Sequence, residues 1–219
     1  MGRPRTKIGR SQRYTAPEFK PYVAALGQLA LAWNDLQESL RGLYWTLSMQ
    51  GFPQAGDFVN YAPLHVWSSI PSDRQQRGML KALVENIPPY WGREKLAEDV
   101  CWLIEKATAL EQARNDCVHS PLFSVDYSLY GPPGSTEKIA PAAWLLNTRA
   151  AGLKKRSEIL GLLGEFRHTR DRAIALSDYA RAIDFAVARP QQTWPRRPSL
   201  PDRQAKKGDK NPRPARERS

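Results

Sequence analysis

The feature that most constrains this chain is a long apolar stripe with helical spacing near its N-terminus. Between residues 14 and 50, apolar side chains recur at steps of three and four residues, which places them on one face of an α-helix. The stripe consists of Leu26, Leu29, Ala30, Trp33, Leu36, Leu40, Leu43, Tyr44 and Leu47. A helix with one apolar face needs neighbours that cover it, so the stripe predicts a helical bundle.

Three further segments have the same helical spacing. The second helix is expected over residues 72–86, the third over 93–119 and the last over 153–187. The third helix must end before Pro121, because the residue that precedes a proline is disfavoured in the α conformation. Residues 52–63 are expected to be a loop between the first two helices.

Between the third and the last helical segments, the period of the apolar residues changes to two. Residues 123–129 alternate between apolar and polar side chains, which is typical of a β-strand. A glycine- and proline-rich turn follows at 131–135, and residues 143–148 are expected to return as the second strand of a hairpin. The fold class is therefore mainly all-α: a bundle of about four main helices with a β-hairpin insert after the third helix.

The formal net charge of +11 is concentrated at the two ends of the chain. Residues 1–13 carry five basic residues and no acid, and residues 189–219 carry ten basic residues against three acids, which leaves −1 for residues 14–188. We therefore expect a basic flexible N-terminal arm (1–13), one helical domain (14–188) and a basic, proline-rich, disordered tail (189–219). The arms either attract nucleic acid through counterion release or only keep the chain soluble.

Several classes of protein are not expected. No run of about eighteen apolar residues is present, so no membrane span is predicted. The two cysteines, Cys101 and Cys117, lack metal-ligand spacing, so the sequence predicts neither a metal site nor another cofactor. Cysteines without a disulfide pattern favour a reduced, cytoplasmic compartment.

The three histidines of the chain differ in their surroundings. His65 has no charged neighbour, so it is expected at the surface or at the edge of the core. His168 lies between arginines on a charged helix face, so it is expected in solvent. His119 instead closes the hexapeptide that begins with Arg114 and Asn115, at the end of the third helix. Asn115 and His119 are four residues apart, hence on one face of that helix.

Arg114 continues the apolar stripe of Ala107 and Leu110, so it should point towards the core or an interface. A guanidinium in such a place requires an anionic partner, which is either an acidic neighbour or a phosphate. A guanidinium that binds phosphate oxygens, beside an imidazole that titrates near neutrality, can carry out phosphodiester cleavage. A structural polar network is the alternative interpretation of the same residues.

The Arg114-Asn115-x3-His119 pattern resembles the signature of HEPN domains (higher eukaryotes and prokaryotes nucleotide-binding). The segment Trp33-Asn34-x-Leu36-x-Glu38 of the first helix is also similar to that family, although only the hexapeptide is specific within residues 20–187. The resemblance implies a helical bundle, often dimeric, in which two motifs face each other across a cleft. It also implies that Arg114 binds the scissile phosphate, that His119 is a general acid or base, and that Asn115 orients them. Asn34 and Glu38 would support the motif from the first helix.

Two kinds of function remain open at this point. The first is a metal-independent RNA endonuclease of the toxin or defence type, with RNA as substrate, an antitoxin or effector protein as possible partner, and a homodimer as assembly. The second is a non-catalytic HEPN-like module that binds RNA, nucleotide or a partner protein, or a helical scaffold whose arms bind nucleic acid. Whether the chain is an enzyme therefore depends on Arg114, Asn115 and His119.

Overall fold

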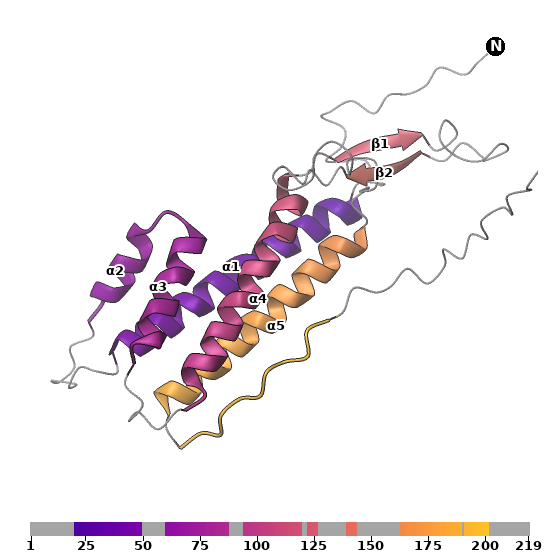
Figure 1. The fold of residues 1–219 in the computed structure, drawn as a ribbon. Coiled ribbons are helices and arrows are strands. Elements are labelled where there is room, and N and C mark those ends of the chain that lie inside the picture. Colours follow the sequence, from indigo (N-terminus) through magenta and orange to yellow (C-terminus); the bar gives the residue numbers. More distant parts are fainter. Residues whose placement is uncertain are drawn as a thin grey trace, which may run out of the picture.

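The computed structural model describes residues 20–49, 60–87, 94–119, 122–126, 139–143, 163–189 and 191–201. The helices in these residues are α1 (Lys20–Met49), α2 (Ala62–Ser69), α3 (Asp73–Glu85), α4 (Leu96–His119) and α5 (Leu163–Ala188). The described part is mainly helical, as predicted (Figure 1). None of its helices is long and apolar enough to cross a membrane.

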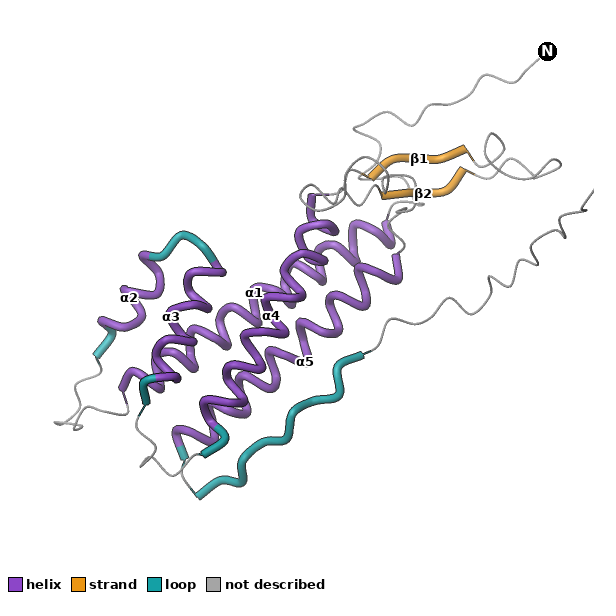
Figure 2. Tube along the Cα trace, in the orientation of Figure 1, coloured by secondary structure: helices purple, strands orange, loops and turns teal. Residues whose placement is uncertain are grey.

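The bundle is organised around α1 and α5, which lie side by side and run in the same direction (Figures 1 and 2). Arg170 of α5 donates to Gln28 near the start of α1, at 2.6 Å, and the Ser39 and Ser177 hydroxyls meet 2.9 Å apart further along. α4 runs in the opposite direction beside this pair, and α3 packs on α4 and α1. The end of α4 therefore lies beside the beginnings of α1 and α5 (Figure 1).

The apolar stripes of the helices form the core, as their spacing predicted. In α1 the stripe residues are buried or half-buried, and Leu29, Leu36, Leu40 and Leu43 are fully enclosed. Each such leucine, when fully buried, stabilises the folded state by about 1.5–3 kcal/mol relative to an exposed one. The matching residues of the other two long helices are Val100, Leu103, Ala107 and Leu110 in α4 and Phe166, Ala173, Leu176, Ala180 and Ile183 in α5.

The short helix α2 was not predicted from the sequence. The expected loop over residues 52–63 is wrong at Ala62 and Pro63, which begin α2; residues 52–59 lie outside the described part. Proline is tolerated in the first turn of a helix because its missing N–H would have no partner there. The helix is held by one anchor, since Trp67 is buried and its ring packs 5.3 Å from that of Tyr44. A single anchor leaves no apolar period in the sequence.

Two short strands follow α4. β1 (Leu122–Asp126) pairs antiparallel with β2 (Ile139–Ala143), and Leu122 lies opposite Ala143. β2 begins earlier than the second strand expected over residues 143–148, of which 144–148 lie outside the described residues. The expected turn at 131–135 also lies outside them, so the hairpin insert stays a prediction.

Residues 191–201, which we call the C-terminal strap, lie along the bundle after α5 ends (Figure 2). The indole N–H of Trp194 donates to Asp99 at 2.6 Å, Arg197 pairs with Asp99 and Glu98, and Leu200 packs against the core. The prediction of a disordered tail over 189–219 is thus wrong for the strap; residues 202–219 lie outside the described part. Composition misled here because three anchoring residues, Trp194, Arg197 and Leu200, suffice to fix a proline-rich segment.

Truncation should reveal the contribution of the strap to stability. A chain that ends at residue 190 is expected to unfold at a lower temperature than one that ends at residue 201. The shorter chain leaves the Asp99 carboxylate, which is buried, without Trp194 and Arg197. A buried polar group that loses its partners costs about 1–3 kcal/mol. Thermal unfolding followed by circular dichroism measures the difference, and equal midpoints would contradict the described packing.

Candidate functional site

The predicted motif lies in the last two turns of α4. Arg114, Asn115 and His119 all belong to this helix, and His119 is its final residue, so the four-residue spacing of Asn115 and His119 falls on one helix as expected. The backbone of His119 is described, whereas the side chains of His119 and Asp116 lie outside the described part. The geometry of the site therefore starts from Arg114 and Asn115.

Arg114 is half-buried and points across α4 towards α1. Its guanidinium carbon lies 5.4 Å from the centre of the Trp33 ring, and its Nη1 donates to Asn115 Oδ1 at 2.8 Å. Its Nε is buried and has no hydrogen-bond partner among the described residues. Within the described side chains, Arg114 is held by an aromatic face and a neutral amide, and it forms no ion pair.

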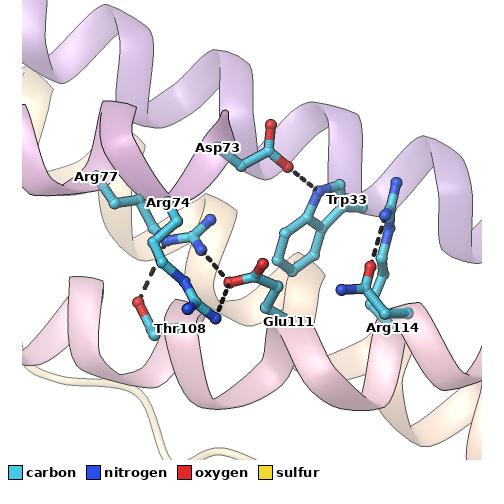
Figure 3. Close-up of polar contacts among 8 residues, drawn as sticks. Trp33, Asp73, Arg74, Arg77, Thr108, Glu111 and Arg114 are labelled. Carbon is cyan, nitrogen blue, oxygen red and sulfur yellow. Dashed lines mark hydrogen bonds and ion pairs between the residues drawn. The ribbon is translucent and has the colours of Figure 1, made fainter. Parts of the chain in front are cut away.

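Trp33 is the side chain on which this arrangement rests. Its ring is only 1% exposed, and its Nε1 donates to Asp73 Oδ2 at 2.9 Å, which fixes the plane of the ring. A second guanidinium, that of Arg77, lies 5.8 Å from the ring centre. In the view of Figure 3, Arg77 and Arg114 lie on opposite sides of Trp33. A cation over a desolvated indole gains about 2 kcal/mol or more.

Arg77 is buried to the same degree as Trp33, at 1% exposure. Its Nη2 donates to Glu111 at 2.6 Å and its Nε to Thr108 at 3.3 Å, while Nη1 has no partner among the described residues. Burial lowers the pKa of the Arg77 guanidinium, and the neighbouring Glu111 carboxylate partly opposes this change. Arg74, which is mostly exposed, approaches the same Glu111 oxygen at 3.5 Å (Figure 3).

Sequence analysis missed Arg77, although a signal was present. Arg77 stands three and seven residues before Leu80 and Val84, the buried residues of α3, and so lies on the apolar face of that helix. The residues from Asp73 to Gly78 are almost all polar, so the apolar face of this helix is not apparent there in the sequence. The same test that singled out Arg114, a charged residue on an apolar stripe, would have found Arg77.

Asn34 and Glu38, the residues of α1 that were expected to support the motif, make no contact with it among the described side chains. Asn34 is exposed, and Glu38 pairs with Arg41 at 2.9 Å on the same helix. Their neighbour Trp33 makes the contact instead. His65 is exposed, as expected, and His168 is half-buried. In the described residues, no group of three or more histidine, cysteine, aspartate or glutamate side chains could hold a metal ion.

Comparisons of the chain with protein-family models, with curated proteins and with solved structures found no match. The resemblance to HEPN domains therefore depends on the residues of the motif and their setting. In that setting, charged side chains from α3 and α4 surround Trp33 of α1, and one guanidinium has no carboxylate partner among the described side chains.

The buried ion pair should dominate the stability of this cluster. Glu111→Gln is expected to destabilise the protein by about 3–5 kcal/mol, because it leaves the Arg77 charge buried without a counterion. The matched control is Glu38→Gln, which breaks an exposed pair within α1 and should cost about 1 kcal/mol or less. Urea unfolding of both variants measures the two values. Equal losses would mean that Arg77 does not depend on Glu111.

Proposed function

We propose that this chain is a metal-independent RNA endonuclease of the HEPN type, in which Arg114 and His119 carry the reaction. The observation that supports it most is the state of Arg114. Its guanidinium is fixed on Trp33 and bonded to Asn115, yet no described carboxylate neutralises it. It also belongs to the same helix end as His119. A fixed guanidinium that pairs with no described carboxylate suits a phosphodiester, and the proposal assigns the proton transfer to His119 at the same helix end.

The chemistry requires only the groups of the motif and the RNA. His119 as general base takes the proton of a ribose 2′-hydroxyl, whose oxygen then attacks the adjacent phosphorus. The bond from phosphorus to the 5′-oxygen breaks, and that oxygen takes up a proton from the imidazolium form of His119, which restores the neutral imidazole. Arg114 stabilises the charge that develops on the phosphoryl oxygens. The products are a 2′,3′-cyclic phosphate and a free 5′-hydroxyl, and DNA is spared because it lacks the attacking group.

Cleavage in the presence of EDTA tests this proposal. The purified protein is expected to cut single-stranded or structured RNA and to leave 2′,3′-cyclic phosphate ends. His119→Ala should lower the rate by about 10²–10⁴-fold, the contribution of a positioned acid or base. Arg114→Ala should lower it by about 10²–10³-fold, the effect of removing a donor to the developing charge. Gel analysis of labelled RNA measures the rates, and circular dichroism shows whether the helices persist.

Matched controls separate the motif from general effects of charge or of a contaminant. His65→Ala removes an exposed histidine of α2, and Arg181→Ala removes an arginine of α5 whose side chain is 59% exposed. Both should cleave like the native protein. Unchanged cleavage in the Arg114 and His119 variants would place the activity elsewhere. RNA binding without cleavage by the native protein would favour the non-catalytic module.

The proposal includes the HEPN-like form of the bundle with its hairpin insert, and a symmetric dimer that brings two motifs together. Support for an assembly of this kind is the place of the motif at the end of α4 rather than in the middle of the bundle. RNA is the expected partner, and an antitoxin or effector protein would act on the same surface. Light scattering at micromolar concentration is expected to show a dimer, and a monomer would contradict the shared cleft.

The basic arms are proposed to bind the RNA backbone without reading its sequence. Because the strap packs on the bundle, the arms of this proposal are residues 1–13 and 202–219, with formal charges of +5 and +4. Replacing both arms by neutral glycine–serine segments of equal length should weaken RNA binding and flatten its dependence on salt. Fluorescence anisotropy at several salt concentrations gives both quantities. The same affinity and slope would show that the arms only keep the chain soluble.

A further inference from the structure

Glu111 stands where it would be expected to neutralise Arg114. The two residues are three positions apart on α4, a spacing at which opposite charges on a helix surface meet. The structure has Glu111 turned to α3 instead, where its carboxylate accepts from Arg77 at 2.6 Å and lies 3.5 Å from Arg74 (Figure 3). The acid one turn before Arg114 on the helix is thus engaged by other arginines.

We propose that Arg77 is a positioning residue, which holds Glu111 on α3 and thereby keeps the Arg114 guanidinium available for a phosphodiester of RNA. This inference rests on the proposed function, because it explains how the same site retains its positive charge. Arg77 acts through Glu111 and touches neither the RNA nor the reacting atoms.

Burial explains why Glu111 stays with Arg77. The Arg77 side chain is 1% exposed, whereas the Glu111 side chain is 19% exposed, so their attraction is little screened by water. Separating them would leave a buried guanidinium uncompensated, which is strongly unfavourable. Arg114 depends less on a carboxylate partner, because the Trp33 ring and Asn115 already hold its guanidinium.

Trp33 keeps the two guanidinium groups apart. This residue of α1 is buried against α3 and α4. Its indole Nε1 donates to Asp73 Oδ2 at 2.9 Å, and this hydrogen bond fixes the ring. Arg77 and Arg114 both lie within 6 Å of the ring centre, on opposite sides in Figure 3. The aromatic ring therefore supplies a surface for both cations without neutralising either.

The test uses three variants of the full chain. Arg77→Met frees Glu111 to pair with Arg114. The rate of RNA cleavage should then fall roughly 10- to 100-fold, and so should the affinity for an uncleavable 2′-O-methyl RNA, as for the loss of a hydrogen bond to a charged group. Arg77→Met with Glu111→Gln removes the released carboxylate and should restore both to within about threefold. Arg74→Met is the matched control, since Arg77 still holds Glu111, and it should change little.

A structural role of Arg77 would give a different pattern. If Arg77 only supported the fold, the double variant would lose activity as the single one does, and that result would overturn the proposal. If Arg77→Met alone does not fold, the double variant still decides: near-native RNA binding supports the proposal, and loss of binding contradicts it.

A readout without RNA separates this inference from the proposed function. The side-chain N–H resonance of Arg114 should shift in Arg77→Met, where a carboxylate pairs with it, and return in the double variant. If the native protein does not cleave RNA but this resonance behaves as expected, the proposed function fails and the role of Arg77 stands. An unshifted resonance in a folded Arg77→Met protein contradicts the role of Arg77.

Discussion

The contact between Trp33 and its two guanidinium neighbours determines how the rest of the described bundle is arranged around the motif. The ring lies in the core of α1, its N–H is bonded to α3 through Asp73, and its faces receive Arg77 and Arg114. One side chain thus ties together the three helices from which the site is made. Since α1 also packs along the length of α5, the end of α4 is fixed relative to the whole bundle. A site that must hold charges at short range needs such rigid support.

The electrostatics of the cluster follow from burial more than from the number of charges. A buried arginine needs a counterion, and Glu111 provides it, so the charge of Arg77 is compensated within the bundle. Arg114 is less buried and is held by an aromatic face and an amide. On α4, Glu111 therefore compensates the charge of Arg77, while Arg114, one turn later, pairs with no described carboxylate. An arginine of the second kind is suited to an anion that comes and goes, such as a phosphodiester.

The sequence predicted the long helices because their apolar residues have a clear period, and it predicted the end of α4 because proline follows it closely. It did not predict α2, in which Trp67 is the one buried residue, nor the strap, whose few anchoring residues stand among basic residues and prolines. Within the site, a charged residue on an apolar stripe identified Arg114, and the same signal at Arg77 was hidden by polar neighbours. Which arginine takes Glu111 depends on the packing of α3 on α4, and no local pattern contains that information.

The most direct test of this account is a crystal structure of the His119→Ala protein, which should bind but not cut, with a short RNA. The account predicts that the Arg114 guanidinium leaves Asn115 or shares it, and donates to oxygens of one phosphodiester at about 2.7–2.9 Å, the distance of a charge-assisted hydrogen bond. Arg77 should remain on Glu111 in that complex. A phosphate bound by Arg77 or Arg74, with Arg114 unchanged on Trp33, would contradict the account, and so would RNA bound away from the end of α4.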